Sequence, residues 1–112
     1  MAKKRTSMKR ITMLELKRPY DSLKKEELIL DVRTPAEFAN GHVRGAKNIP
    51  VDRVMNHVDE LRQYNALYVH CAAGMRSQAA CEILSKFGLQ NVVCIDEGGY
   101  ADWAEAGFPV ER

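Results

Sequence analysis

The segment LYVHCAAGMRS, residues 67–77, passes from an apolar run into a loop of small residues and then towards a helix. Two more short apolar runs occupy residues 28–32 and 92–95. All three are rich in branched side chains and lack strict alternation, which predicts strands of a sheet covered on both faces. Weaker signals at residues 46–49 and at Ile11 predict further strands, the latter at an edge of the sheet.

Helix signals lie between these runs. Two capping boxes, Thr12-Met13-Leu14-Glu15 and Thr34-Pro35-Ala36-Glu37, predict helix starts, and Pro19 is expected to end the first helix. Three more helices are predicted. The first is capped by Asp52, and its apolar face holds Val54, Met55, Val58 and Leu61. The second follows Ser77, and its apolar face holds Ala80, Ile83, Leu84 and Phe87; the third lies near residues 100–106. Strands that alternate with helices predict an α/β fold, with a mostly parallel central sheet between helices in three α/β/α layers.

The chain has the size and composition of one globular domain, with 112 residues, 46% of them hydrophobic and 29% charged. Residues 1–10 carry five of the 17 basic residues and none of the 15 acidic ones, which leaves residues 11–112 with a net charge of −3. We expect residues 1–10 to form a basic, flexible arm and residues 11–112 to form the domain. Contact of the arm with nucleic acid or anionic lipid is the alternative.

No apolar run approaches the roughly 18 residues that a membrane-spanning helix requires. No apolar stretch of a secretory signal follows the basic start. We therefore expect a cytoplasmic protein that binds neither membrane nor nucleic acid.

Three cysteines, Cys71, Cys81 and Cys94, make an odd count without a Cys-x-x-Cys pair. This argues against a disulfide framework, and the histidines and cysteines lack the spacing of a structural zinc site. Ligands of open parallel sheets bind beyond the carboxyl ends of the strands. Cys71 stands at such an end, whereas Cys81 falls in a predicted helix and Cys94 in a predicted strand, where we expect core residues.

A reactive role for Cys71 requires its thiolate, because a thiol with a pKa near 8.5 is only about 3% ionised at pH 7. The unpaired N–H groups at the start of the next helix and the cation Arg76 both favour an anion there. Ala72, Ala73 and Gly74 are small enough for the backbone to point successive N–H groups at the sulfur. We expect an anion-binding nest that lowers the pKa of Cys71; the alternative is a small buried core residue.

Three blocks of sequence carry a family resemblance: residues 30–50, with LDVRTPAEF, GHVRGA and NIP; the loop CAAGMRS at residues 71–77; and residues 98–109, from GGY through Trp103 to GFP. In this order and register they resemble the single-domain rhodanese-like sulfurtransferases. The resemblance covers about residues 28–110 and implies a rhodanese-like fold and a sulfurtransferase of the thiosulfate:cyanide type.

The resemblance implies a reaction in which Cys71 takes a sulfane sulfur from thiosulfate or a persulfide and holds it as a persulfide. A thiol or a protein cysteine then accepts the sulfur, with cyanide as the acceptor in an assay, and no metal or organic cofactor is implied. Donor binding is implied for the residues that follow the nucleophile: Ala72, Ala73, Gly74, Met75, Arg76 and Ser77. Their amides would stabilise the persulfide, and Arg76 would orient an anionic donor.

Two other functions remain open. Related cysteine phosphatases have five residues between cysteine and arginine, whereas four separate Cys71 from Arg76, which favours the tighter sulfurtransferase loop. A non-catalytic module that binds a protein has no need for the thiol, although Met75 could pack against a partner. Ala72 and Ala73 are apolar where many thiosulfate-using members carry a basic or polar residue, so a low thiosulfate rate and a protein persulfide donor are also consistent with the loop.

Other polar residues near these blocks are expected to be structural. Asp31 and Arg33, two residues apart at a strand end, predict an ion pair, and Glu37 belongs to its capping box. His70 precedes the nucleophile, but neighbouring strand residues point to opposite faces, so it is a poor candidate for a general base. His42 is expected to anchor a loop and His57 to lie on the polar side of its helix. Tyr100 and Trp103 are expected to fill the core below the site, and the alternative is that one of them lines the pocket.

Overall fold

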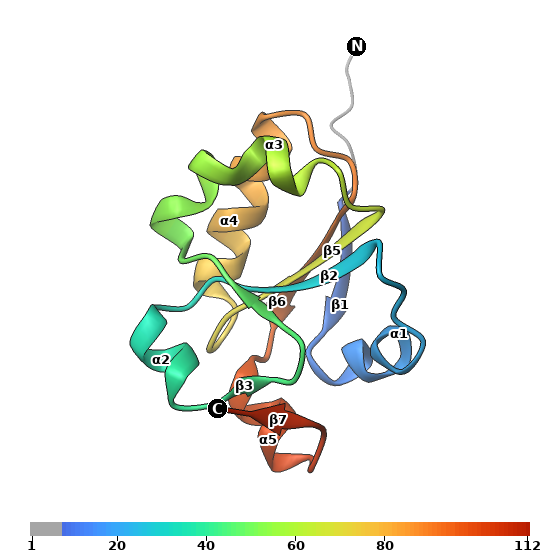
Figure 1. Ribbon diagram of the computed structural model, residues 1–112, viewed down its shortest axis with the longest axis vertical. Coiled ribbons are helices and arrows are strands. Elements are labelled where there is room, and N and C mark those ends of the chain that lie inside the picture. The colour runs from blue at the N-terminus through green and yellow to red at the C-terminus, as the bar shows by residue number, and fades with distance from the viewer. Residues whose placement is uncertain (1–7) are drawn as a thin grey trace.

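The computed structural model of the chain describes residues 8–112. A central sheet of five parallel strands has the order β1-β6-β5-β2-β4 (Figure 1). These strands are β1 (Lys9–Thr12), β6 (Val92–Glu97), β5 (Ala66–His70), β2 (Glu27–Asp31) and β4 (Lys47–Asn48). A small antiparallel sheet pairs β3 (His42–Val43) with β7 (Val110–Glu111). The strands predicted from the sequence are confirmed, including the weak signal near residue 47.

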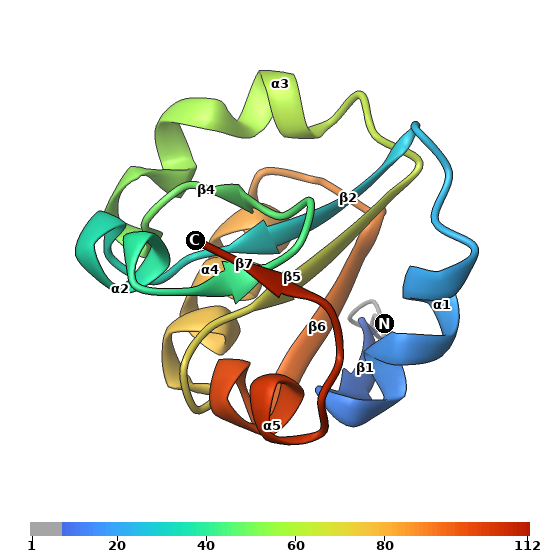
Figure 2. The ribbon, with the colours of Figure 1, turned by 60° about the horizontal axis from the view of Figure 1, so that its bottom comes forward.

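Helices cover both faces of the central sheet (Figures 1 and 2). One face carries the 3₁₀ helix η2 (Val51–His57) with α3 (Val58–Leu61) and α4 (Met75–Lys86), and the other carries the 3₁₀ helix η1 (Leu14–Leu16) with α1 (Lys17–Asp21) and α5 (Tyr100–Glu105). The short helix α2 (Pro35–Ala39) follows the carboxyl end of β2. The predicted α/β fold with a mostly parallel sheet is confirmed.

Side chains alternate between two cores along the strands. In β5, Leu67 and Val69 pack in the core on the α4 side, and Tyr68 packs against the opposite core around Trp103. Cys71, two residues beyond Val69, continues the α4 side. Because both faces of the sheet are buried, the sequence of its strands shows no polar alternation.

The prediction that Pro19 ends the first helix is wrong. The capping box does form, with the amide of Thr12 donating to Glu15 Oε1 at 2.8 Å and the amide of Glu15 donating to Thr12 Oγ1 at 3.1 Å. Pro19 nevertheless lies inside α1, which begins two residues earlier at Lys17. Proline is tolerated there because the N–H groups of a first helical turn have no acceptor within the helix.

The helix predicted after residue 51 also differs from expectation. No side chain caps η2, so the prediction that Asp52 caps it is wrong. Val54 and Leu61 are buried as expected, but Met55 is 53% exposed. A 3₁₀ helix has three residues per turn, so Met55 points away from the side of η2 on which Val54 packs in the core. Phe87, expected on the apolar face of α4, follows the end of that helix and is 43% exposed.

The domain begins before the predicted boundary at residue 11. Lys9 and Arg10 belong to β1, where they align with Val93 and Cys94 of β6. The edge strand predicted at Ile11 thus starts two residues earlier than expected, and the charge of Lys9 and Arg10 concealed this start, because charged side chains are common on edge strands. The rest of the predicted arm, residues 1–7, lies outside the described residues.

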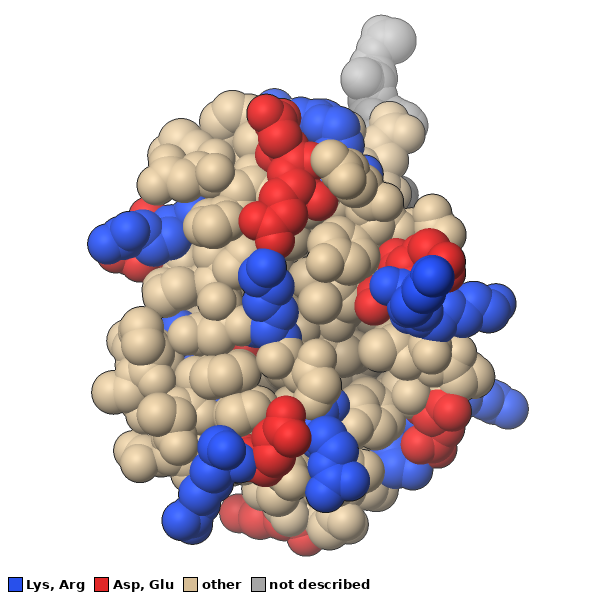
Figure 3. Space-filling view, viewed as in Figure 1, with Lys and Arg blue, Asp and Glu red and all other residues tan. Residues whose placement is uncertain are grey.

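Charges of both signs are mixed over the face shown in Figure 3, where acidic and basic side chains lie next to one another. Within residues 8–112, no helix has the length and apolar character needed to cross a bilayer.

Candidate active site

Cys71 lies immediately after β5 at the carboxyl edge of the sheet and is 1% exposed. Two backbone amides donate to its sulfur, that of Gly74 at 3.1 Å and that of Ser77 at 3.2 Å. The hydroxyl oxygen of Ser77 lies 3.4 Å from the same sulfur. All these contacts come from residues 71–77, here named the Cys71 loop, which comprise the turn after β5 and the first three residues of α4.

Two opposing effects act on the pKa of the Cys71 thiol. Burial raises it, because the thiolate loses its hydration. Hydrogen bonds from the Ser77 hydroxyl and from the amides of Ser77, Gly74 and Ala73 lower it. The hydrogen bonds outweigh burial, so the pKa of Cys71 lies below its ordinary value.

The hydroxyl of Ser77 has one proton and several acceptors. Its oxygen lies 2.6 Å from the carbonyl oxygen of Ile95 and 3.0 Å from that of Gly74. When it donates to either carbonyl, its lone pairs can accept the thiol proton of Cys71; when it turns to the sulfur, it stabilises the thiolate. The amides of Gly74 and Ser77 can only donate, so they point to the sulfur whether Cys71 is a thiol or a thiolate.

The first turn of α4 supplies more donors. Within the described chain, the amides of Met75 and Arg76 hydrogen-bond to no other group, as is usual at a helix start. The side chain of Met75 is 83% exposed. The Cys71 loop therefore combines a buried sulfur with unused N–H donors and an exposed apolar side chain in the adjacent turn.

Two glycines allow the tight packing of the Cys71 loop. Gly74 has φ of +107°, and a Cβ there would lie 2.4 Å from a backbone carbonyl oxygen of β6. A Cβ on Gly99 would lie 1.8 Å from the carbonyl oxygen of Ala72. The next residue, Tyr100, donates its amide to the carbonyl oxygen of Cys71 at 3.0 Å. The chain after β6 thus packs directly on the loop, which leaves no room for a side chain at either glycine.

Arg76, the residue expected to orient an anionic donor, is held by a carboxylate. Its Nη1 and Nη2 atoms donate to Glu37 Oε1 at 2.7 Å and Oε2 at 3.0 Å. Glu37 also accepts from the amide of Thr34 at 2.9 Å, as its capping box predicts. Hydrogen bonds from Arg76, and then from Thr34, lower the pKa of Glu37 to about 2, so this carboxylate is charged at neutral pH.

The Arg76–Glu37 pair was not predicted from the sequence. Glu37 already had a local role in its capping box, and nothing in the sequence connects α2 with the start of α4. The signal that could have suggested the pair is the presence of an acidic residue on the helix that follows β2, since that helix begins at the same edge of the sheet as the Cys71 loop.

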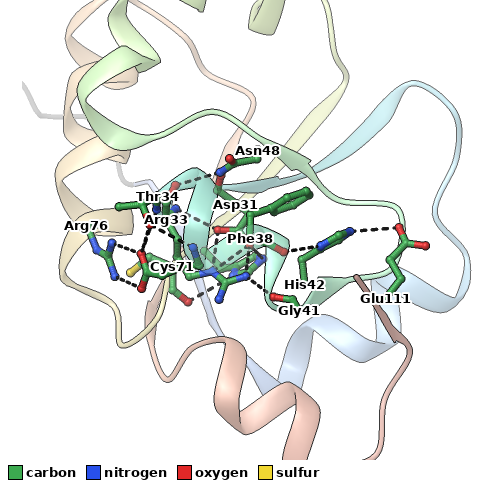
Figure 4. Close-up of polar contacts among 12 residues, drawn as sticks. Asp31, Arg33, Thr34, Phe38, Gly41, His42, Asn48, Cys71, Arg76 and Glu111 are labelled. Atoms are coloured by element: carbon green, nitrogen blue, oxygen red, sulfur yellow. Dashed lines mark hydrogen bonds and ion pairs between the residues drawn. The ribbon is translucent and has the colours of Figure 1, made fainter.

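A second arginine at this edge is also paired with a carboxylate (Figure 4). Arg33 Nη2 donates to Asp31 Oδ2 at 2.7 Å and to the carbonyl oxygen of Gly41 at 2.7 Å. Its guanidinium lies 4.4 Å from the ring centroid of Tyr100. Asn48 Nδ2 donates to the backbone carbonyls of Asp31 and Arg33, at 2.9 Å each. The predicted ion pair therefore forms, and these contacts connect the end of β2 with β4 and with the chain after α2.

His70 is fully buried between this network and the Cys71 loop. Its Nδ1 lies 3.3 Å from the carbonyl oxygen of Cys71 and its Nε2 lies 3.9 Å from Asp31 Oδ2. Among the described residues, Nε2 has no hydrogen-bond partner. Burial lowers the pKa of His70, and the charge of Asp31 opposes this effect. Strand alternation places the ring on the opposite side of β5 from the sulfur, where it cannot act as its base.

The other residues considered in the sequence have structural contacts. Cys81 and Cys94 are buried free thiols in the core on the α4 side. Trp103 is completely buried in the opposite core. His42 Nδ1 lies 2.8 Å from the carbonyl oxygen of Phe38 and anchors the chain after α2. Within residues 8–112, no three His, Cys, Asp or Glu side chains are grouped as a metal site would require.

Comparison with known proteins places this architecture in a family. Residues 12–106 match the family described as Rhodanese-like domain. A Bacillus subtilis protein named uncharacterized protein YqhL is 35% identical over 96 residues, which are 86% of this chain and 72% of that protein. A protein from Allochromatium vinosum named Sulfurtransferase is 32% identical over 83 residues, which are 74% of this chain and 77% of that protein.

A solved structure from Rhodopseudomonas palustris is similar with a TM-score of 0.83 and 25% identity, covering 93% of this chain and 85% of that one. It is described as a protein of unknown function and a possible tyrosine phosphatase. The family match extends over most of the described chain, from the last residue of β1 to the end of α5, and includes the Cys71 loop. On this evidence the chain belongs to the rhodanese-like domain family.

Proposed function

We propose that the protein is a sulfurtransferase of the thiosulfate:cyanide type that carries a sulfane sulfur as a persulfide on Cys71. The observation that carries the proposal is the convergence of the Gly74 and Ser77 amides on a buried sulfur whose pKa is lowered. The backbone of Ala72 to Ser77 would bind the donor and the persulfide. The name of the Allochromatium vinosum relative supports this class of reaction.

The first step is attack of the Cys71 thiolate on the outer sulfur of the donor. With thiosulfate, the bond between its two sulfur atoms breaks, sulfite leaves with the electron pair of that bond, and Cys71 becomes a persulfide anion. The free amides of Met75 and Arg76 are available to the new terminal sulfur. In the second step a thiolate, or cyanide in an assay, attacks the terminal sulfur, and the Cys71 thiolate leaves.

Intact mass spectrometry tests the proposal. Incubation with thiosulfate or a low-molecular-weight persulfide is expected to add roughly 32 Da, the mass of one sulfur atom, to the native chain. Cys71→Ser should abolish the adduct, whereas Cys81→Ala should retain it because Cys81 is a buried core thiol whose pKa is raised. If no donor in such a panel produces the adduct, the site is not a sulfurtransferase site, and a protein-binding module becomes the better explanation of the fold.

Phosphatase activity is the second candidate, because the solved structure from Rhodopseudomonas palustris is described as a possible tyrosine phosphatase. Two features of this chain oppose it. The guanidinium of Arg76 is engaged by both oxygens of Glu37, and only four residues separate Cys71 from Arg76. We expect no hydrolysis of p-nitrophenyl phosphate; turnover that is lost in Cys71→Ser would favour the phosphatase assignment.

A further inference from the structure

The Arg76–Glu37 pair controls the charge that a sulfur donor meets at the Cys71 loop. We propose that Glu37 is a specificity-determining residue: by neutralising Arg76 it makes sulfur donors that carry at most one negative charge better substrates than the dianion thiosulfate, which the site still accepts. This inference rests on the sulfurtransferase function proposed above and defines the substrate class of the same site.

The charges of the described residues support this assignment. Residues 72–75 and Ser77 have uncharged side chains, so Arg76 is the one charged side chain of the Cys71 loop. The carboxylate of Glu37, which accepts two hydrogen bonds from Arg76, balances that positive charge. The carboxylate of Asp31 balances the charge of Arg33 in the same way. Once Cys71 ionises, these groups together carry a net negative charge. A dianion then meets about twice the repulsion that a monoanion meets.

The arrangement is a persistent one. Glu37 is fixed at the start of α2 by its capping bonds with the amide and hydroxyl of Thr34, and bidentate bonding fixes the guanidinium plane of Arg76 against it. The side chains of Arg76 and Glu37 are 36% and 35% exposed, so the pair is accessible to small anions from solvent. The two bonds to Glu37 use one N–H of each Nη atom, so the guanidinium keeps further donors, but its positive charge is already balanced by the carboxylate.

Two donors that form the same product isolate the effect of charge. Thiosulfate, a dianion, gives up its outer sulfur to the Cys71 thiolate and releases sulfite. Benzenethiosulfonate, a monoanion, gives up its terminal sulfur to the same thiolate and releases benzenesulfinate. In both reactions one sulfur–sulfur bond breaks, one forms at Cys71, and the leaving group takes the electron pair. The ratio of kcat/KM for the two donors therefore reports on donor binding and attack, because the later transfer to cyanide is common to both.

The decisive variant is Glu37→Gln, which removes the negative charge and keeps a side chain suited to a capping box. We expect the thiosulfate-to-benzenethiosulfonate ratio of kcat/KM to rise about fivefold at low salt, and the rise to shrink in concentrated KCl. Glu15→Gln is the matched control, because Glu15 forms with Thr12 the two reciprocal capping-box bonds that Glu37 also forms with Thr34. An unchanged ratio in Glu37→Gln, or an equal rise in Glu15→Gln, would overturn the assignment.

A charge-neutral double variant separates charge from architecture. Arg76→Gln alone is expected to lower the ratio, and Glu37→Gln with Arg76→Gln, again neutral as a pair, is expected to return the ratio to the wild-type value. A merely structural role of the ion pair predicts instead that the ratio is the same in the single and double variants while stability falls.

Alkylation of Cys71 keeps this inference distinguishable from the proposed function. Iodoacetate is an anion and iodoacetamide is neutral, and both react with the thiolate without any sulfur transfer. The ratio of their rates at Cys71, followed by peptide mass, should rise in Glu37→Gln and stay at the wild-type value in Glu15→Gln. If it rises but no donor forms the persulfide, the proposed function fails and the charge effect stands. If it does not rise, the charge effect itself is absent.

Discussion

The sulfur of Cys71 is buried and yet surrounded by donors, and the balance of these two conditions decides its chemistry. Burial alone would make it one more inert core thiol, like Cys81, whose pKa is raised by its hydrogen bond with Cys94 and by burial. The amides of Gly74 and Ser77 reverse this result for Cys71. Two thiols of one core thus differ in the direction of their pKa shifts, because within the described chain only Cys71 of the two accepts hydrogen bonds from backbone amides.

The pH dependence of alkylation tests this difference. The rate of reaction of native Cys71 with iodoacetamide should rise with pH and level off at a lower pH than it does for free cysteine, because the pKa of Cys71 is lowered. Ser77→Ala should move the plateau to higher pH, since the hydroxyl is one of the groups that lower this pKa. A native profile that levels off above pH 8, or a variant profile that coincides with it, would contradict the account of the site.

The Cys71 loop is shaped by the chain that packs on it more than by its own sequence. Its small residues permit several conformations. The selected one brings Gly74 against β6 and Gly99 against the carbonyl of Ala72. The helix α4 then begins at Met75 without a side-chain cap, which leaves its first amides free for a ligand.

The contact of Gly74 with β6 predicts a large effect of a single methyl group. Gly74→Ala should destabilise the protein by about 3 kcal/mol or more in urea unfolding, because a positive φ and a clash with a backbone carbonyl add together. Gly107→Ala is the matched control, since Gly107 has φ of +79° but no atom within 4 Å of its Cβ position. It should cost only about 1–2 kcal/mol. Equal losses in the two variants would show that the contact with β6 is unimportant.

Across the sheet as a whole, a buried polar cluster supports the active edge. Asp31, Arg33 and His70 are each 5% exposed or less. Besides their bonds to one another, Asp31 accepts from the backbone amide of Arg33, and the Arg33 side chain donates to the carbonyl oxygen of Gly41. His70 is the exception, because its Nε2 lacks a partner within the described chain. Its burial disfavours the protonated form. Near and below the ordinary histidine pKa of about 6.5, His70 is therefore protonated less readily in the folded chain than in an unfolded one.

Acid should therefore weaken the fold in a way that depends on His70. The pKa of His70 is lowered in the folded state, so stability is complete above the unfolded value near 6.5 and falls as the pH drops below it. The loss should reach at most about 1.4 kcal/mol per pH unit for this one proton. His70→Gln should flatten the curve of unfolding free energy against pH between about pH 7 and pH 5. Parallel curves for the wild-type protein and His70→Gln would exclude His70 as the titrating group.

The features that could be predicted from the sequence alone were local patterns or periodic ones. Apolar runs predicted β2, β5 and β6, reciprocal hydrogen bonding in the two capping boxes was read from four-residue patterns, and parallel-sheet geometry singled out Cys71 among three cysteines. Each of these depends on neighbours within a few positions, or on a rule that holds for all parallel sheets.

The pairing of Arg76 with Glu37, the packing of Gly99 on Ala72 and the buried contact of His70 with Asp31 appeared only in the folded chain. In each case residues far apart in sequence meet because the order of the strands brings their carboxyl ends together. Composition identifies which side chains can form an ion pair, but the crossovers between strands determine which of them come within hydrogen-bonding distance. For this protein the candidate nucleophile could be selected from its own segment of sequence, whereas the ion pairs around it depend on distant segments.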